Sequence, residues 1–487
     1  MNYIEGQERT QLELQPTCLD DYVSENNMVR VIEAFVSMLD MVKLGFKNAV
    51  LNKEGRPPFN PAALLKLYIY GYLNLVRSSR RLEAETHRNV EVMWLLCNLT
   101  PDDKTISNFR KDNAEALKKV YREFSKLCNK LGLHGKELVA QDGTKVRANS
   151  SRHNIFDQRK AEKALAATDK KIEKYMNMLD ENDAAESKDP RYNADDIAEI
   201  LKALSGKKET LESLLDQINE RDGEPVSIVD PDAHIMKQSG EGRPYDACYN
   251  VHTVVDSKHN LILDFKISTN ASDSGELFEL TESAKEIMEV DAIAATADKG
   301  FYSADDIAAC EENGTTCYVP KVNDKGRAPD PAYNKRHFKY DKENDCYICP
   351  EGKALPYKRA SFIAAGVTDG RLYQDTKACK TCAKRALCTQ NKKQGRTLKR
   401  LLNQDALDTV DKRMRTRHGR LILKRRRELV EHPFGTVKKV WGYGQYLCRG
   451  LARVTAEQSM AFLAYNLRRV INIFHNDGAD LLLAMGS

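Results

Sequence analysis

The order of hydrophobic periods along the chain is the feature that most limits its fold. Apolar residues recur at helical spacing through residues 1–130. From about Lys136 they recur at every second position, as in a strand, and over Phe156–Asp222 they return to helical spacing. Strand patterns then resume. This order predicts an all-α N-terminal domain followed by an α/β core with a mixed sheet, which a helical hairpin interrupts.

The N-terminal domain, residues 1–130, is expected to hold at least three helices. Asn60-Pro61 supplies an N-cap and a first-turn proline. Further helices are expected from about Arg80 to Cys97 and from Asp103 toward Leu131. Basic residues on these helices suit a small DNA-binding bundle, and a packing or dimerisation domain fits equally well; the DNA-contact candidates are Arg80, Arg81 and Arg110.

The remaining chain divides at changes of pattern. The core is expected at 131–156 and 223–330, with the hairpin at 157–222 inserted in it. A loop-rich, Cys-bearing insertion follows at 331–395, and a basic segment with C-terminal helices at 396–487 completes the core. The expected strands are Glu137–Ala148, Tyr249–Asp256, Leu261–Ser268, Ile293–Asp298 and Thr316–Pro320, and the expected helices Ser274–Val290, one from about Ser303, Thr409–Val430 and Thr455–Phe474.

The charge of the chain is concentrated in one late segment. The net charge is only +5, yet Lys384–Arg427 contains 16 Lys and Arg residues against 3 Asp. Such a block is typical of a surface that contacts nucleic acid, and also of a solvated face or flexible arm.

Composition excludes two broad classes. With 41% hydrophobic residues the chain is not wholly disordered, and its longest apolar stretches, such as Met460–Leu467, are too short to cross a membrane. Met1–Arg9 carries acidic residues where a signal peptide would be basic, so we expect a cytoplasmic protein. Its 12 cysteines are then expected as thiols and metal ligands.

Three carboxylates occupy positions that an α/β sheet could bring together. Asp142 lies within the first strand, Asp298 ends a later strand, and Glu431 lies in a C-terminal helix. A cluster of this kind can hold two divalent cations that position phosphodiester oxygens. Spacing alone is a weak signal, because ordinary surface or salt-bridged carboxylates give the same pattern.

Several motifs resemble those of the DDE transposases of bacterial insertion sequences, most of all insertion-sequence family eleven-eighty-two of the RNase H-like superfamily. The resemblance covers most of the chain. The matching motifs are Ser78–Glu83, Trp94-Leu95, Pro101–Arg110, Asp142–Lys145, Asp230–Ala233, Tyr249–Val251, Ala297–Tyr302, Phe434-Gly435 and Tyr465–Arg469. Arg427, Glu431 and Lys438 fit the spacing of the family's third acidic motif, in which Lys424 replaces a tyrosine.

The resemblance implies an RNase H-like core whose catalytic acids are Asp142, Asp298 and Glu431, with Glu428 one helical turn from the last. Two Mg²⁺ or Mn²⁺ ions would serve DNA cleavage and strand transfer at terminal inverted repeats. The partners implied are double-stranded DNA and a second copy of the chain, or more, at paired ends, in the bacterial cytoplasm at the nucleoid. The phosphate-contact candidates are Lys145, Lys299, Lys424, Arg427 and Lys438.

Two other activities fit the same residues. A transposase-derived DNA-binding regulator would have lost catalysis, which the intact set of acids disfavours. A hydrolytic nuclease of the same superfamily would cut without strand transfer. His432 could act as a base but is expected to be structural, and the hairpin is expected to be structural or a dimer contact, with recognition of DNA ends as the alternative.

The cysteines form a separate pattern. Cys346 and Cys349 form one C-x2-C pair, Cys379 and Cys382 form another, and Cys388 follows. Paired C-x2-C motifs are typical of a structural zinc site with four thiolates. Unligated thiols and an iron–sulfur cluster are the alternatives, and Cys388 is a possible further ligand.

Overall fold

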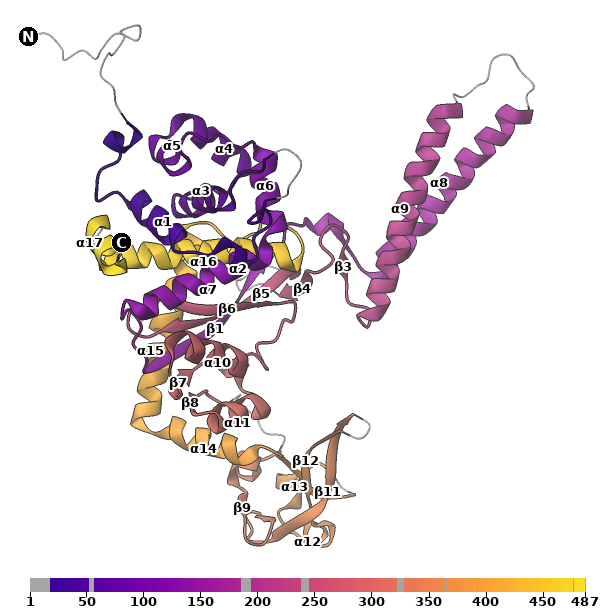
Figure 1. Ribbon diagram of the computed structural model, residues 1–487. Helices are drawn as coiled ribbons and strands as arrows, with labels where there is room; N and C mark the ends of the chain where they lie inside the picture. The colour runs from indigo at the N-terminus through magenta and orange to yellow at the C-terminus, as the bar shows by residue number, and fades with distance from the viewer. Residues whose placement is uncertain are drawn as a thin grey trace, which may run out of the picture.

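The computed structural model describes residues 18–51, 57–184, 194–237, 245–321, 328–364, 367–391, 393–475 and 477–486. Met1–Arg9 and the polar break at Pro190 therefore lie outside the described residues. Figure 1 shows a helical N-terminal part at the top, a central sheet flanked by helices, and a smaller sheet at the bottom. A long helical hairpin projects from this body.

The N-terminal part consists of short helices. Two helices expected to be continuous are each broken at an asparagine. The side-chain oxygen of Asn89 accepts the N–H of Glu91 at 3.0 Å, so a new helix begins there. Asn113 breaks the second by accepting the N–H of Lys47 at 2.7 Å. The helices are α1 Met28–Ser37, α2 Met41–Leu44, α3 Pro61–Leu73, α4 Ser79–Arg88, α5 Val90–Leu96, α6 Asp103–Asp112 and α7 Ala114–Lys130.

The central sheet is mixed. Its path is β4-β5-β1-β7-β8, with β6 also paired to β5. Strand β5 runs antiparallel to β1 and β6, whereas β1, β7 and β8 are parallel. All five strands expected from the sequence are present. Their bounds are β1 Leu138–Arg147, β4 His234–Lys237, β5 Tyr245–Asp256, β6 Ile262–Ser268, β7 Ile293–Thr296 and β8 Thr315–Tyr318.

Helices cover both faces of this sheet. Val139 of β1 packs with α10 (Leu277–Met288) on one face, whereas Leu138 and Ala140 pack with Leu429 and Val430 of α15 on the other. Because side chains alternate along a strand, Asp142 points from the α15 face. The order of the chain thus places a charged helix over the carboxylate of β1. Helix α11, Ala304–Glu312, lies between β7 and β8 in the sequence.

The C-terminal helices close the core. The expected helix Thr409–Val430 is broken at Thr416, whose hydroxyl accepts the N–H of Gly419 at 3.0 Å and starts a new helix. Helix α16 packs against α3, α7 and β6, and so joins the N-terminal helices and the central sheet in one hydrophobic core. The bounds are α14 Gln404–Arg415, α15 Arg417–Phe434, a π-helical turn Gly435–Val440, α16 Leu451–Ile473 and α17 Gly478–Met485.

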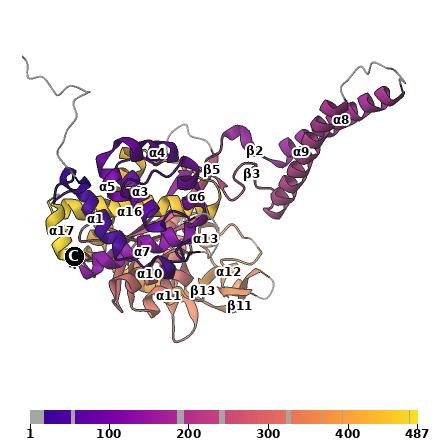
Figure 2. The ribbon, with the colours of Figure 1, turned by 45° about the horizontal axis from the view of Figure 1, so that its top comes forward.

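The projecting hairpin consists of α8, Gln158–Ala184, and α9, Ala194–Glu220. At its root the two-residue strands β2, Ile155–Phe156, and β3, Val226–Ser227, pair antiparallel. A small apolar cluster that includes Leu211 and Ile218 packs the two helices together near this root. Figures 1 and 2 both show the hairpin leading away from the body.

The Cys-bearing region was expected to be loop-rich, and this expectation is wrong. The region forms a five-stranded antiparallel sheet in the order β13-β12-β11-β10-β9. Its longest strand, β11, has register shifts, and these irregularities hide the two-residue alternation that would identify a strand. The bounds are β9 Lys339–Asp341, β10 Cys346–Ile348, β11 Ala354–Ala364, β12 Val367–Tyr373 and β13 Leu398–Leu401, with short helices α12 Thr376–Lys380 and α13 Arg385–Cys388.

Candidate functional site

The structure brings two of the predicted acids to neighbouring strands. In the parallel pair of β1 and β7, Ala140 lies opposite Thr296. Asp142 lies two residues further along β1, and Asp298 lies two residues past Thr296, just beyond the end of β7. Asp298 begins a short helical turn and accepts the N–H of Gly300 at 2.5 Å. The two aspartates therefore lie near each other, Asp142 in the middle of β1 and Asp298 just after the parallel strand β7.

The surroundings of Asp142 oppose its ionisation. Burial raises its pKa to about 6, despite the nearby guanidinium of Arg426 and the N–H of Gly143, both of which favour the ionised form. The carboxylates of Asp298 and Asp273 raise the pKa further. The Arg426 Nη1 to Asp142 Oδ1 distance is 3.5 Å, and the arginine side chain is only 13% exposed. Asp142 thus lies in a partly buried cluster of negative charge that one arginine only partly balances.

Asp273, in the loop before α10, is a member of this cluster that the sequence did not single out. Its Oδ1 accepts a hydrogen bond from Asn250 at 2.9 Å and lies 3.6 Å from Nδ1 of the buried His252. A Cβ at Gly143 would come within 2.6 Å of this carboxylate, and one at Gly300 within 3.0 Å. The glycine after each predicted aspartate therefore leaves the space that Asp273 occupies. Neither spacing nor periodicity signals this contact, because its three segments meet only in the fold.

Glu431 lies on the helix that faces Asp142, but its own side chain is exposed. The residue of α15 that meets Asp142 is Arg426, five positions earlier. Within the described parts of the chain, no three His, Cys, Asp or Glu side chains form a group that could hold a metal ion. The helix of Glu431 thus covers the face of the sheet from which Asp142 points, whereas Glu431 itself is exposed and forms no metal-holding group with the aspartates among the described residues.

His432 has structural contacts. Its Nδ1 lies 2.8 Å from the hydroxyl of Tyr465, which donates in turn to the carbonyl of Asn260 at 2.9 Å. Because that hydroxyl proton is committed to Asn260, His432 is the donor to Tyr465. Burial and the nearby Arg469 lower the pKa of His432. These contacts favour the structural interpretation over a catalytic base.

The predicted phosphate-contact residues differ in their surroundings. Lys438 reaches into the sheet, where its Nζ donates to the Thr144 hydroxyl at 3.2 Å and to the carbonyl of Lys145 at 2.5 Å. The Lys145 Nζ itself lies 3.4 Å from the carbonyl of Lys237. The exposed members of the set are Lys299, Lys424 and Arg427.

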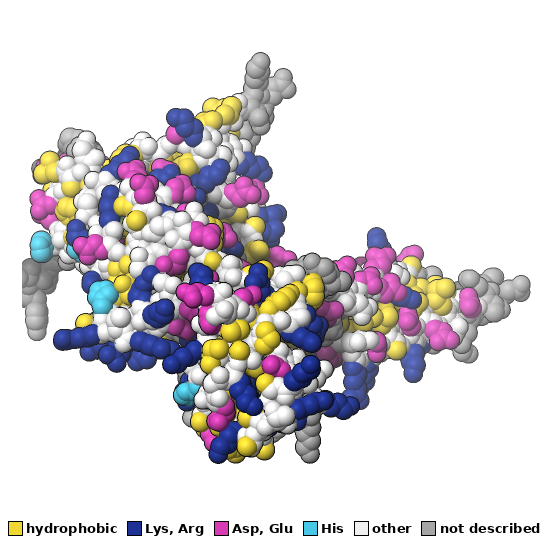
Figure 3. Space-filling view, turned by 90° about the horizontal axis from the view of Figure 1, so that it is seen from below, with side chains coloured by type: hydrophobic (Ala, Val, Ile, Leu, Met, Phe, Trp, Pro, Cys, Tyr) yellow, Lys and Arg dark blue, Asp and Glu magenta, His cyan; other side chains and the backbone are white. Residues whose placement is uncertain are grey.

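The basic segment is not a free arm. Arg413 of α14 makes two contacts with the Glu311 carboxylate, at 2.5 and 2.9 Å, and Arg400 contacts Asp405 at 2.5 Å. Its exposed cations include Lys393, Lys412, Arg415, Arg417 and Arg420. Figure 3 shows Lys and Arg side chains gathered at the lower left of the face seen from below. Part of the segment is therefore structural, and part is available to a polyanion.

The N-terminal arginines also differ. Arg80 is exposed and lies 3.4 Å from a carboxylate oxygen of Asp103, and Arg81 is exposed as well. Arg110 instead packs 5.7 Å from the ring centre of Tyr68 and donates to the hydroxyl of Tyr72 at 3.3 Å. Arg110 is therefore a packing residue in this structure, which weakens the expectation that it contacts DNA.

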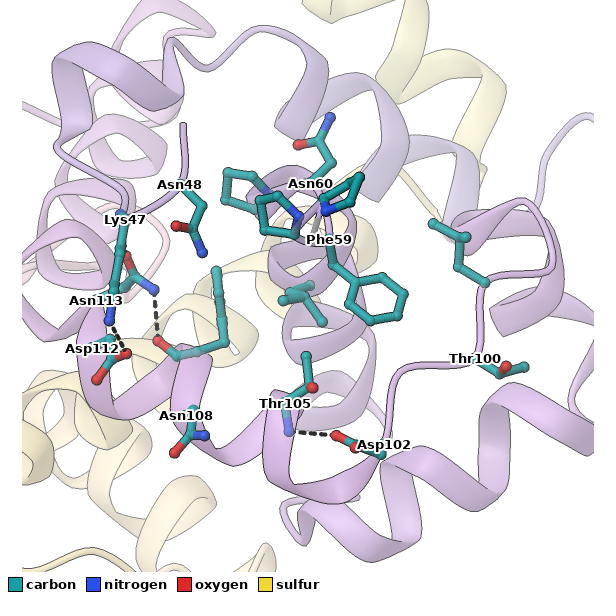
Figure 4. A pocket seen from close by; sticks show the side chains of 16 residues that line it. Lys47, Asn48, Phe59, Asn60, Thr100, Asp102, Thr105, Asn108, Asp112 and Asn113 are labelled. Carbon is teal, nitrogen blue, oxygen red and sulfur yellow. Dashed lines mark hydrogen bonds and ion pairs between the residues drawn. The ribbon is translucent and has the colours of Figure 1, made fainter. Parts of the chain in front are cut away.

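A hollow of about 680 Å³ opens in the N-terminal domain (Figure 4). Its lining includes Phe59, Asn60 and Thr100. The acidic residues there are already bound: Asp112 pairs with Lys47 at 2.7 Å, and Asp102 accepts the N–H of Thr105 at 2.7 Å as the cap of α6. The hollow thus presents mainly apolar and amide groups and has no arrangement suited to acid–base chemistry.

The cysteines of the smaller sheet are brought together in part. Cys349, Cys379, Cys382 and Cys388 line one small cavity. Cys346, which the spacing had placed in the set, is buried in β10 opposite Asp341 and Pro356 and does not line the cavity.

None of the described helices is long and apolar enough to cross a membrane.

Comparison with known families gives two matches. Residues 17–112 match a family model described as a transposase domain of the DUF772 type, and residues 348–471 match one described as a transposase DDE domain. The second range contains Glu431 but neither Asp142 nor Asp298. No curated protein and no solved structure matches the chain. The two matches support a DDE transposase, and with it a DNA-cleaving activity, without identifying the insertion-sequence family.

Proposed function

We propose that the chain is the transposase of a bacterial insertion sequence of family eleven-eighty-two, which binds the terminal inverted repeats and catalyses DNA cleavage and strand transfer. The observation that carries the proposal is the placement of Asp142, in β1, near Asp298, just after the parallel strand β7, on a sheet that the helix bearing Glu431 covers. Transposase-family matches on both sides of this core support it.

The strand order supports an RNase H-like core. In the path β6-β5-β1-β7-β8 only β5 is reversed, and helices pack on both faces. Asp142 lies in β1, the first of these strands along the chain. Asp298 follows β7, the fourth, and Glu431 lies on the later helix α15. The hairpin α8–α9 and the smaller sheet are insertions in this scheme, because each lies between segments that complete the core.

Asp142, Asp298 and Glu431 are the proposed ligands of two Mg²⁺ or Mn²⁺ ions. Carboxylates are the hard oxygen donors that these ions prefer. Burial first, and then the carboxylates of Asp298 and Asp273, raise the pKa of Asp142, and a bound cation would favour its ionised form. Bound ions would activate the attacking water or 3′-hydroxyl and stabilise charge on the phosphate. Glu431 would need to turn from solvent toward Asp142 to join them.

Residues of the chain itself would position the DNA. Lys438 fixes β1 beyond Asp142 through Thr144 and the carbonyl of Lys145. Exposed Lys299 follows Asp298 directly, and exposed Arg427 and Lys424 lie on α15. We assign these last three to phosphate contacts, which hold DNA in place without reading its sequence.

The N-terminal helices, with exposed Arg80 and Arg81, are proposed to bind the terminal repeats. The active assembly would be a dimer or larger on paired ends, acting on nucleoid DNA in the cytoplasm. The hairpin α8–α9 supplies an extended surface for a subunit contact.

The decisive experiment incubates the full chain with labelled terminal-repeat DNA and Mg²⁺. Wild type should give both cleaved and joined products, while Asp298→Asn and Glu431→Gln should bind the DNA without cutting it. Glu428→Gln is the matched control, since it removes an exposed carboxylate of the same helix and should retain activity.

Other outcomes point elsewhere. Cleavage without joining would indicate a hydrolytic nuclease, and tight binding without cleavage by wild type would indicate a DNA-binding regulator. Equal loss in the Glu428 and Glu431 variants would remove the assignment of the third acid.

A further inference from the structure

Four cysteines converge on a single cavity at one end of the smaller sheet. Cys349 follows β10, Cys379 lies in α12, and Cys388 ends α13; Cys382 lies between these two helices. The cavity has a volume of about 30 Å³, enough for one small atom or ion. Three separate segments thus contribute thiols to the lining of one cavity.

One donor beside the cavity favours the thiolate form of Cys349, whereas burial raises the pKa of Cys388 to about 11. The N–H of Lys353 donates to Cys349 Sγ at 3.3 Å, and N–H donors of this kind stabilise a negative sulfur. Lys353, Arg385 and Arg396 also line the cavity, together with Glu351. The guanidinium of Arg396 lowers the pKa of Cys388 and so partly offsets the effect of burial.

Close packing fixes Cys379. Gly395 has a φ of +81°, and a Cβ at that position would lie 3.0 Å from Cys379 Sγ. The turn at Gly395 therefore backs the sulfur of Cys379, and any larger residue would displace it. The contact between Gly395 and Cys379 is independent of the cations, and it also fixes the position of a thiol.

Cys346 has different neighbours. It is 5% exposed, lies in β10 opposite Asp341 and Pro356, and has Asp341 and Asp345 as its charged neighbours. Burial, and then these two carboxylates, raise the pKa of the Cys346 thiol. The C-x2-C pattern of Cys346 and Cys349 therefore does not correspond to a shared site.

The surrounding domain has a small hydrophobic core, against which Cys349, Cys379 and Cys388 also pack. Its hydrophobic cluster of buried residues consists of Phe338, Tyr347, Leu355, Tyr373 and Leu398. Small domains with cores of this size usually rely on a disulfide or a structural metal. All five cysteines of the region are free thiols in the structure.

We propose that Cys349, Cys379, Cys382 and Cys388 form a closed structural Zn²⁺ site, and that Cys346 is not a ligand. Zn²⁺ would bind four thiolates tetrahedrally, and the four sulfhydryl protons would pass to solvent. No three of these thiols already form a group that could hold a metal, so binding would draw the side chains inward around the cavity. The site does not depend on the catalytic proposal.

Metal content of the full-length protein, purified without chelator, tests the assignment. Wild type and Cys346→Ser should each contain about one zinc per chain, whereas Cys388→Ser should lose most of it or bind zinc at least tenfold more weakly. Zinc retained in Cys388→Ser and lost in Cys346→Ser would overturn the ligand set. Iron in place of zinc, or wild type with neither metal, would overturn the proposal.

A second measurement uses wild-type protein alone and so tests the assignment even if a cysteine variant fails to fold. Wild-type protein is alkylated with iodoacetamide before and after zinc removal by a strong chelator, and the labelled cysteines are mapped by mass spectrometry. Cys349, Cys379, Cys382 and Cys388 should be protected together and become reactive together. Exposed Cys97 should react throughout as the control. Labelling of Cys388 before chelation, with Cys349, Cys379 and Cys382 protected, would exclude it as a ligand.

Discussion

Replacing Asp142 with asparagine should make the protein more stable at pH 8. In the fold the pKa of Asp142 is raised to about 6, against about 4 in an unfolded chain. At about 1.4 kcal/mol per pH unit, this difference means that ionised Asp142 costs the folded state about 3 kcal/mol. Asparagine resembles the neutral acid in shape and carries no such cost.

The dependence on pH follows from the direction of the pKa change. Below about pH 4 the carboxyl is neutral in both states and the cost is absent; it grows between pH 4 and 6 and is constant above pH 6. Asp142→Asn should therefore exceed wild type by about 3 kcal/mol at pH 8 and match it near pH 4.

Urea unfolding in a Trp94→Phe background measures the effect. The remaining tryptophan, Trp441, packs against Tyr443 and Tyr465 and reports on the core. Asp291→Asn, at an exposed position of the same sheet domain, should change stability little at either pH. Saturating Mg²⁺ should stabilise wild type, by about 2.7 kcal/mol at 100 times its Kd, and leave Asp142→Asn unchanged.

The reasoning fails if Asp142→Asn is less stable than wild type at pH 8. It also fails if the difference in unfolding free energy is the same at both pH values, because Asp142 would then ionise in the fold as easily as in the unfolded chain.

Three further predictions concern packing and DNA contacts. Leu429→Ala should lower the free energy of unfolding by about 2–5 kcal/mol in urea titrations, since Leu429 packs α15 on β1; a loss under 1 kcal/mol would contradict this packing. Arg110→Ala should lower the thermal midpoint of the N-terminal domain while DNA affinity at matched temperature stays unchanged, because its guanidinium is engaged with Tyr68 and Tyr72. Lys299→Gln should weaken binding to repeat and unrelated DNA alike and reduce the slope of log K against log salt by about one, measured by fluorescence anisotropy; a loss confined to the repeat would show that Lys299 reads sequence.

The sequence predicted the elements whose side chains follow a clean period. The strand of Asp142 was predicted from Leu138, Ala140 and Val146 on one face, and its observed bounds differ from the expected ones by one residue at each end. Strand patterns in the sequence also located β5, β6, β7 and β8. Since Asp298 directly follows an apolar run, its position near a strand end could also be read from the chain.

Contacts between distant segments escaped prediction because no local pattern encodes them. Asp273 approaches Gly143 and Gly300 only once β1, β7 and the loop before α10 are assembled. The C-x2-C spacing likewise favoured Cys346 over Cys388. In the fold Cys346, in β10, does not line the cavity, whereas Cys388, at the end of α13, does. The breaks at Asn89 and Asn113 were missed because apolar periodicity continues across them while the asparagine side chains bond to backbone groups.

The narrow root of the α8–α9 hairpin makes it a mechanical lever. Each helix has 27 residues, hence a length of about 40 Å, and a single pairing of two-residue strands lies at its root. A rotation of ten degrees at β2–β3 would move the far end by roughly 7 Å, given that length. A force applied at the far end of α8–α9 would therefore exert a larger force at β2–β3. The chain runs into β2 from β1, the strand that carries Asp142, through one short 3-10 turn.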